Sequence, residues 1–95
     1  MKMGRVIGSV VSTRKDPKLA GLKLLIVENL TLDLEPEGGY VVAVDAVGAG
    51  AREVVLYATG SSARQTEQTR DRPVDAVIMA ILDQYDVGGR TVRLA

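Results

Sequence analysis

The sequence predicts a mainly β protein that folds as a small closed barrel with one short helix. Its 95 residues suffice for one domain. Hydrophobic residues make up 46% of the chain, yet the only aromatic residues are three tyrosines. The remaining apolar residues are mostly Val, Leu, Ile and Ala, which suit pleated, closely packed surfaces. They form short segments separated by glycine-rich corners, and closing such a sheet into a barrel removes its exposed edges.

Four strands are predicted in the first two thirds of the chain. They cover residues 3–13, 22–34, 40–47 and 53–58. The first is rich in Val and Ile, with Gly4 and Gly8 as kinks or points of close approach. The first part of the second strand is almost entirely apolar, which predicts that both of its faces are buried. In its later part, apolar and polar residues alternate, which predicts one buried face and one exposed face. A charged loop at residues 14–21 and a turn at residues 35–39, EPEGG, join the first three strands.

The segment at residues 73–85 matches two periodicities. Helical spacing relates Val74, Val77, Ile78, Ile81, Leu82 and Tyr85. Strand spacing relates Val74, Ala76, Ile78, Ala80 and Leu82. Because Pro73 suits the first position of a helix, we favour a helix here, with a strand as the open alternative. The polar stretch before it, residues 60–72, has room for one short helical turn, and residues 90–94 alternate as a last strand after Gly88-Gly89.

The predicted order is therefore four strands, a helical segment and a final strand. A closed barrel of the OB type is the architecture most compatible with this order and length. A chain of this size buries only roughly 60–65% of its unfolded surface, so its own core is modest. Oligomerisation is a common way to bury more.

Charge is balanced overall but unevenly placed. The net charge is zero, which argues against a nucleic-acid binder. Residues 1–23 hold six basic side chains and one acidic one, a net +5, whereas residues 28–53 hold six acidic and one basic, a net −5. Two oppositely charged regions could pair with further copies of the chain or with a patterned neighbour, while each single charge fits an ordinary solvated face equally well or better.

Two residue types that often carry chemistry are missing. The chain has no cysteine and no histidine, which excludes disulfides, thiolate or imidazole metal ligands and a cysteine nucleophile. Its longest apolar runs, residues 24–27 and 76–82, are far too short to span a bilayer, and the N-terminus lacks an apolar region of signal-peptide length. We expect a soluble cytosolic protein that needs no cofactor, metal ion, nucleic acid or membrane.

Residues 45–64, DAVGAGAREVVLYATGSSAR, combine elements that elsewhere carry catalysis or phosphate binding. Ser61 or Ser62 as a nucleophile would need a base, but histidine is absent and every lysine lies in residues 2–23. The G-x-G-x-x-G pattern starting at Gly48 fails, because its third glycine position is Glu53. We therefore expect glycines that allow positive φ or a bulge in a barrel strand, and a protein that is not an enzyme.

A binding module remains the alternative function, because OB barrels often hold single-stranded nucleic acid or a small ligand. Such binders use aromatic platforms beside a basic groove. Three tyrosines offer little to stack on. A basic rim could still form from Arg52, Arg64, Arg70 and Arg72.

The motifs of this segment, together with those around it, resemble the EutN/CcmL family, the vertex proteins of bacterial microcompartment shells. The similarity runs nearly end to end. An early loop and strand match at Thr13, Lys15, Leu19, Gly21, Lys23, Leu24 and Leu25. The most specific pieces are VAVDAVGAG at residues 42–50 and GSSAR at residues 60–64, followed by PVDAVIMAILD at residues 73–83. One position departs: Arg52 stands where the family commonly has glycine.

The resemblance implies a single vertex domain over residues 1–95, with an OB-like barrel that assembles into a homopentamer. It implies a structural role in the bacterial cytoplasm, where hexamers of another family tile the shell facets and five-fold units supply the curvature that closes them. A ring of heterologous contacts closes when its rotation returns to the start.

Within this resemblance, eight residues are candidates for shaping the protomer or its subunit interface. They are Asp45, Gly48, Gly50, Gly60, Ser61, Ser62, Arg64 and Asp75. Small residues allow close backbone approach, and the serine hydroxyls can satisfy backbone donors in a tight turn. The Arg64 guanidinium suits a neighbour's carboxylate or carbonyl groups, with Asp45 or Asp75 as partners.

Overall fold

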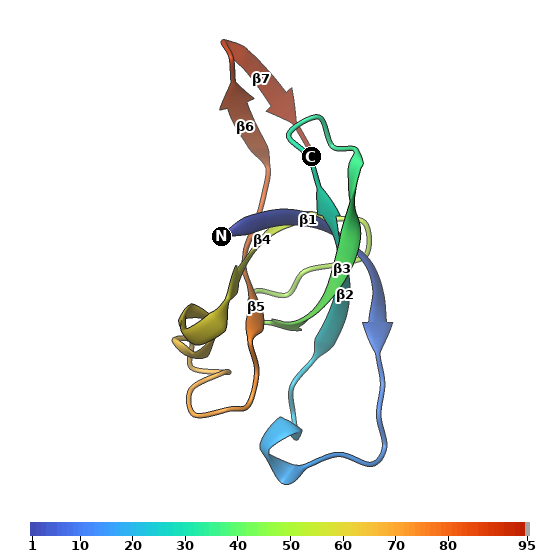
Figure 1. Ribbon diagram of the computed structural model, residues 1–95, viewed down its shortest axis with the longest axis vertical. Helices are drawn as coiled ribbons and strands as arrows, with labels where there is room; N and C mark the ends of the chain where they lie inside the picture. The colour runs from blue at the N-terminus through green and yellow to red at the C-terminus, as the bar shows by residue number, and fades with distance from the viewer. Residues whose placement is uncertain (95) are drawn as a thin grey trace.

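A closed five-stranded barrel forms the body of the molecule, as the computed structural model shows for residues 1–94 (Figure 1). Its strands are β1 (Lys2–Val10), β2 (Leu24–Leu30), β3 (Pro36–Asp45), β4 (Val54–Thr59) and β5 (Ala76–Ile81). A separate hairpin follows, made of β6 (Gln84–Val87) and β7 (Arg90–Arg93). The mainly β closed barrel expected from the sequence is therefore confirmed.

The barrel closes in the order β1-β2-β3-β5-β4. All neighbouring strands pair antiparallel except β3 and β5, which are parallel and meet at Val44 opposite Val77. β1 bends across the barrel so that it pairs with β4 at its start and with β2 along most of its length. At Gly4 the strands lie so close that an added Cβ would collide with Val27 and lie 2.7 Å from the Glu28 carbonyl oxygen.

The helix favoured for residues 73–85 is wrong. These residues form β5 and the start of β6 instead. β5 lies between β3 and β4, and its consecutive residues Ala76, Val77 and Ile78 are all buried, so both of its faces are covered. A strand buried on both faces is apolar at every position and therefore also matches the helical period.

Helical structure within residues 1–94 is confined to two short 3-10 helices. One is η2 (Gly60–Arg64), in the polar stretch where a helical turn was expected. The other is η1 (Pro17–Leu19), in the charged loop, where Asp16 Oδ1 accepts from the Lys18 backbone N–H at 2.9 Å. The expected turn at residues 35–39 is also misplaced, since β3 begins at Pro36 and the chain reverses over residues 31–35.

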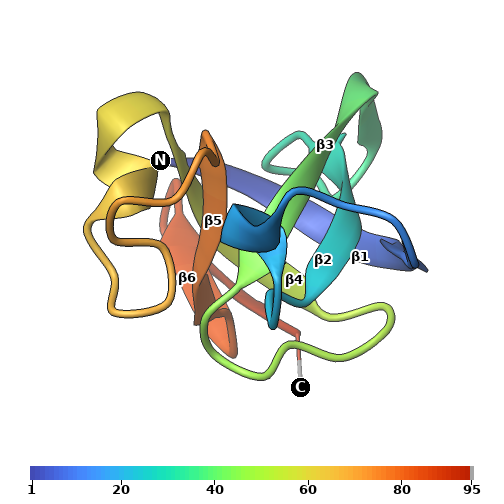
Figure 2. The ribbon, with the colours of Figure 1, turned by 90° about the horizontal axis from the view of Figure 1, so that it is seen from below.

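Two apolar clusters hold the fold together. The larger fills the barrel and comprises Val6, Leu25, Val27, Ala43, Ala49, Val55, Tyr57, Ala76 and Ile78. The smaller lies outside the barrel, where Ala63 of η2 covers Val44, Ala58 and Val77. Seen from below, η2 and the yellow-green connection between β3 and β4 lie on different sides of the barrel (Figure 2).

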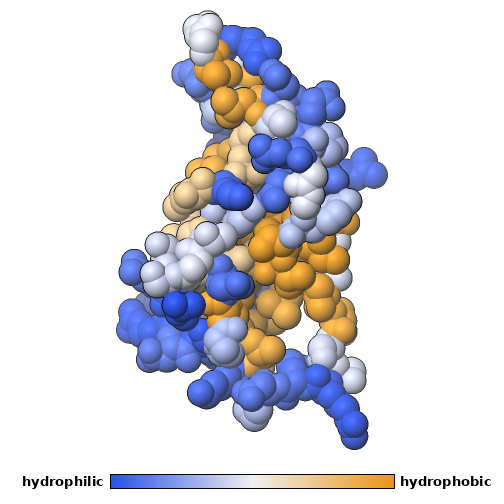
Figure 3. Space-filling model, viewed as in Figure 1, coloured by the Kyte–Doolittle hydropathy of each residue, from blue (hydrophilic) through white to orange (hydrophobic). Residues whose placement is uncertain are grey.

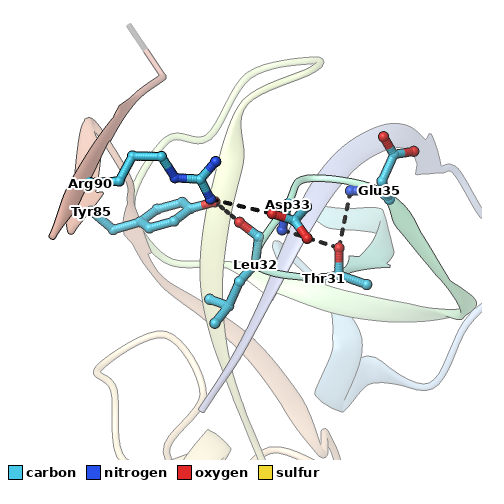
Figure 4. A network of polar contacts seen from close by, with 6 residues as sticks. All are labelled: Thr31, Leu32, Asp33, Glu35, Tyr85 and Arg90. Carbon is cyan, nitrogen blue, oxygen red and sulfur yellow. Dashed lines mark hydrogen bonds and ion pairs between the residues drawn. The ribbon is translucent and has the colours of Figure 1, made fainter. Parts of the chain in front are cut away.

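The hairpin lengthens the molecule to 47 × 23 × 22 Å and projects from one end of the barrel (Figure 1). Contacts with the β2–β3 turn hold it in place. The Tyr85 hydroxyl donates to the Leu32 carbonyl, and Arg90 Nη2 lies 3.3 Å from Asp33 Oδ1 (Figure 4). In the turn itself, the Thr31 hydroxyl accepts from the backbone N–H groups of Asp33 and Glu35.

Candidate functional site

The connection between β3 and β4, residues 46–53, is organised by a single carboxylate. Asp45 Oδ1 accepts from the backbone N–H groups of Val47, Gly48 and Ala49 at 3.1, 3.0 and 3.1 Å. Gly48 has φ +77°, a conformation that glycine adopts without strain. The turn directs Ala49 into the barrel, where it is buried. Asp45 and Gly48 therefore shape the protomer, and this Asp45 oxygen is engaged by its own loop.

Gly50 has a different role from the one expected. Its φ is not positive, so a need for the left-handed region is confirmed for Gly48 and wrong for Gly50. Its backbone N–H donates to Glu53 Oε1 at 2.5 Å. A Cβ at Gly50 would lie 3.0 Å from that same oxygen, so the missing side chain leaves space for the Glu53 carboxylate.

Arg52, the position that departs from the resemblance described above, adopts φ +70°. Its backbone N–H donates to the Val6 carbonyl at 2.8 Å, and its own carbonyl accepts from Arg5 Nη1 at 3.3 Å. The Val6 N–H in turn donates to the Glu53 carbonyl at 3.0 Å. The loop is thus attached to β1 in a left-handed conformation. Glycine would meet this requirement with less strain than arginine.

The second group of candidate residues joins η2 to the segment before β5. Gly60 has φ +65°, and its N–H donates to the Asp75 carbonyl at 2.9 Å. Arg64 Nη1 donates to the Val74 carbonyl at 3.1 Å. Ser61 and Ser62 are exposed, and none of the hydrogen bonds within residues 1–94 uses their hydroxyls, so their expected role as turn-stabilising side chains is not observed.

The eight candidates therefore form two separate hydrogen-bonded units. Asp45, at the end of β3, shapes the β3–β4 connection together with Gly48 and Gly50, and the other five belong to η2 and to the residue before β5. Arg64 forms no ion pair with Asp45 or Asp75 among the described residues of the chain. Its guanidinium instead donates to a backbone carbonyl of its own chain, that of Val74.

Within residues 1–94, no group of three metal-ligating side chains occurs. Burial, and secondarily the negative charge of Glu37, raises the pKa of the Tyr57 hydroxyl. That hydroxyl donates to Asn29 Oδ1, so it is a satisfied buried group. Among residues 1–94, no helix has the length and apolar character needed to cross a membrane.

Two apolar surfaces were not foreseen from the sequence. The first, which we call the hairpin groove, is a depression of about 480 Å³ between the barrel, the β2–β3 turn and the hairpin. Its apolar lining includes Met3, Leu30, Leu32, Leu56, Leu82 and Val87. Alternation along each strand shows which residues share a face, but it does not show which faces remain uncovered.

The second surface, which we call the β1–β3 face, lies on the outside of the barrel. Ile26 points outward because its neighbours Leu25 and Val27 are buried inside. Ile26 of β2 pairs with Val42 of β3 on one side and with Gly8 of β1 on the other. Ile7 is the residue before Gly8. Ile7 and Val42 are 47% and 49% exposed, which is high for large apolar side chains in the middle of strands.

These features define a class of protein: a small closed β-barrel with a projecting hairpin and two exposed apolar surfaces. Comparison with known sequences narrows that class. Residues 1–83 match the family model described as ethanolamine utilisation protein EutN/carboxysome, and the chain belongs to this EutN/CcmL family.

Individual relatives agree with this assignment. The chain is 44% identical over 90 residues to the carboxysome shell vertex protein CcmL of Gloeobacter violaceus, covering 95% of the chain and 90% of the relative. It is 48% identical over 86 residues to the bacterial microcompartment shell vertex protein GrpN of Rhodospirillum rubrum, covering 90% and 97%. These relatives are named as shell proteins, in agreement with the expectation of a non-enzymatic role.

Solved structures show the same fold. The CcmL structure of Nostoc sp. PCC 7120 superposes with a TM-score of 0.94 at 43% identity and covers 100% of both chains. The structure of GrpN from Rhodospirillum rubrum, described as a pentameric microcompartment shell protein, superposes with a TM-score of 0.84 at 46% identity and covers 92% and 99%. The agreement extends over the whole barrel.

Proposed function

We propose that this chain forms a homopentamer that occupies the vertices of a bacterial microcompartment shell. The observation that carries the proposal is the match, over 90% or more of the chain, to relatives named shell vertex proteins, one of them with a structure described as pentameric. A flat hexagonal sheet of facet proteins cannot close by itself. Five-fold units inserted into it supply curvature, and a ring of heterologous contacts provides such a unit.

The energetics of the protomer support assembly. A small barrel has a limited core, and burial between copies adds apolar contact that one copy lacks. The exposed Ile7, Leu32 and Val42 side chains are suited to such burial. The alternative, an OB-type module for single-stranded nucleic acid or a small ligand, lacks comparable support, since no aromatic side chain except Tyr40 is strongly exposed in the described chain.

The remaining partners follow from the same proposal. The pentamer would contact hexameric shell proteins along its edges, within a shell in the bacterial cytoplasm. Arg64 and Asp75 are both exposed and lie at the surface beside η2. Arg64 binds the Val74 carbonyl through Nη1, which leaves the other donors of its guanidinium for a carboxylate or carbonyl of a neighbouring protomer.

Native mass spectrometry of the purified chain tests the proposal. We expect a species of five times the 10.1 kDa chain mass, with five-fold symmetric particles in negative-stain images. The same sample should not shift single-stranded DNA in a gel at low salt. A monomer that binds such DNA with salt-sensitive affinity would support the binding-module alternative and refute the pentamer.

Shell closure is the second test. The chain would be co-expressed with the hexagonal shell proteins of the same organism, and the product examined by electron microscopy. We expect closed polyhedra when the chain is present, and open sheets or tubes when it is left out. Closed polyhedra in both cases would show that the chain is not needed at the vertices.

A further inference from the structure

The hairpin groove is built from three elements that are far apart in the sequence. Its floor is the outer side of β1 and β4, where Met3 lies opposite Leu56. One wall is the β2–β3 turn, which contributes Leu32, and the other is the hairpin, which contributes Val87. Figure 3 shows apolar side chains around the hairpin and beside the N-terminal end of the chain. The groove is therefore an apolar depression at one end of the molecule.

Two polar contacts join the walls of this groove within the protomer. The Tyr85 hydroxyl donates to the Leu32 carbonyl and thereby ties the hairpin to the turn (Figure 4). The ion pair between Arg90 and Asp33 joins the same two elements. A groove whose walls are already joined loses little conformational entropy on binding, which favours association.

The two polar side chains of the groove, Tyr85 and Asp86, are each hydrogen-bonded within the protomer. The Tyr85 hydroxyl is used as just described, and Asp86 Oδ1 accepts from the Thr91 hydroxyl at 2.6 Å. The groove therefore has few unpaired polar groups to recognise a polar small molecule. An apolar protein surface is the occupant that suits it.

The chain itself carries a surface of this kind. On the β1–β3 face, Gly8 lies beside Ile26 and has no side chain that could cover it. The exposed side chains of Ile7 and Val42 lie next to Ile26. Figure 3 shows a second apolar area on the side of the molecule where β1, β2 and β3 lie. The groove borders β4 and the start of β1, so the two surfaces lie on different sides of the barrel.

We propose that the β1–β3 face of one protomer occupies the hairpin groove of the next. This inference rests on the proposed pentamer and assigns its contact surfaces. A ring of heterologous contacts needs two different, complementary surfaces on each copy. One apolar groove and one apolar strand face, on different sides of one barrel, meet that requirement. A second copy of this chain is thus the partner.

Charge substitutions test the two surfaces. In Val42→Asp, on the face, and Leu32→Asp, in the groove, an uncompensated carboxylate would be buried at each contact, which weakens association by about 100-fold or more. Native mass spectrometry should report monomers for both. Both positions are about half exposed in the protomer, so circular dichroism should report an unchanged fold. Gln68→Asp adds a carboxylate on an exposed loop outside both surfaces, and this control should remain pentameric.

A cross-linking experiment tests whether the two surfaces contact each other. The chain contains no cysteine, so introduced thiols react without background. The double variant Val42→Cys with Leu32→Cys, treated with a bismaleimide, should give a ladder on a denaturing gel that ends at five chains. Each single variant should give no ladder, because in a heterologous ring like surfaces do not meet.

The outcomes separate this inference from the proposed function. If the unmodified chain is pentameric but both Asp variants remain pentameric, or the double cysteine variant gives no ladder, the surface assignment is overturned and the pentamer stands. If the unmodified chain is monomeric, the proposed function itself fails. Should an Asp variant unfold, Val42→Ser and Leu32→Ser replace it, and a pentamer that dissociates no more readily than the unmodified one overturns the assignment.

Discussion

The β3–β4 connection and the two apolar surfaces use their chemical groups in opposite ways. In the connection, the Asp45 and Glu53 carboxylates accept hydrogen bonds from backbone N–H groups of the same loop. On the β1–β3 face and in the hairpin groove, large apolar side chains such as Val42 and Leu32 remain about half exposed. The hydrogen-bonded loop thus stabilises the protomer, whereas the apolar surfaces keep large side chains exposed that suit a partner. The predictions below test this division.

Asp45→Ala should produce the largest loss of stability. The substitution leaves three backbone N–H groups of the connection without their carboxylate acceptor. Hydrogen bonds to charged groups contribute about 1.5–3 kcal/mol each, and water replaces part of this at the exposed donors, so we expect a net loss of about 2–3 kcal/mol. Urea denaturation of the protomer measures it. Asp45→Asn keeps one acceptor oxygen and should recover part of the loss; equal losses would mean that the carboxylate does not organise the loop.

Tyr57→Phe should cost about 1–2 kcal/mol, because it removes the buried partner of the Asn29 side chain. The hydroxyl also gives a pH dependence. Its pKa is raised above 10.0 by burial, so the folded state favours the protonated form. The corresponding stability is present below pH 10 and is lost as the pH rises through the raised pKa. Stability should therefore fall more steeply above pH 10 in the unmodified chain than in Tyr57→Phe. Parallel alkaline profiles would contradict this.

The contrast between the two regions also explains how far sequence reasoning reaches. The closed barrel could be predicted because β-rich composition, short apolar runs and glycine corners all favour it. β5 could not, because burial of Ala76, Val77 and Ile78 on both faces gives a pattern that a helix shares. The roles of Asp45 and Gly48 follow from local geometry, but the exposure of Ile7 and Val42 depends on which barrel faces other elements cover.

Arg64→Ala tests whether Arg64 stabilises only the protomer or also the contact between protomers. Within the protomer it loses one exposed hydrogen bond to the Val74 carbonyl, so we expect a loss of roughly 0.5–1 kcal/mol in protomer stability. If its remaining donors bind a neighbour, the pentamer should dissociate at a higher concentration than this loss explains. Dilution followed by light scattering measures the difference. Arg64→Lys, which lacks the planar fork, is the matched control and should restore little.

Arg52→Gly should stabilise the protomer. A non-glycine residue in the left-handed region costs roughly 1–2 kcal/mol, and Arg52 has φ +70°. Glycine loses more backbone entropy on folding, roughly 0.5–1 kcal/mol, so the net gain is about 0.5–1 kcal/mol. Thermal unfolding measures it. Arg52→Ala separates the two effects, since it removes the guanidinium but keeps the strain; a gain as large as that of glycine would attribute the effect to charge rather than to backbone conformation.

Arg90→Ala should have the smallest effect on the protomer. The Arg90 and Asp33 side chains are 61% and 75% exposed, and an ion pair with such exposure contributes about 0–1 kcal/mol. The hairpin keeps its other contact with the turn, between the Tyr85 hydroxyl and the Leu32 carbonyl. Salt near 1 M, where the Debye length is about 3 Å, should abolish even this difference in urea titrations. Because the groove is apolar, the pentamer should survive the same salt, and dissociation there would mean that charge rather than apolar contact joins the protomers.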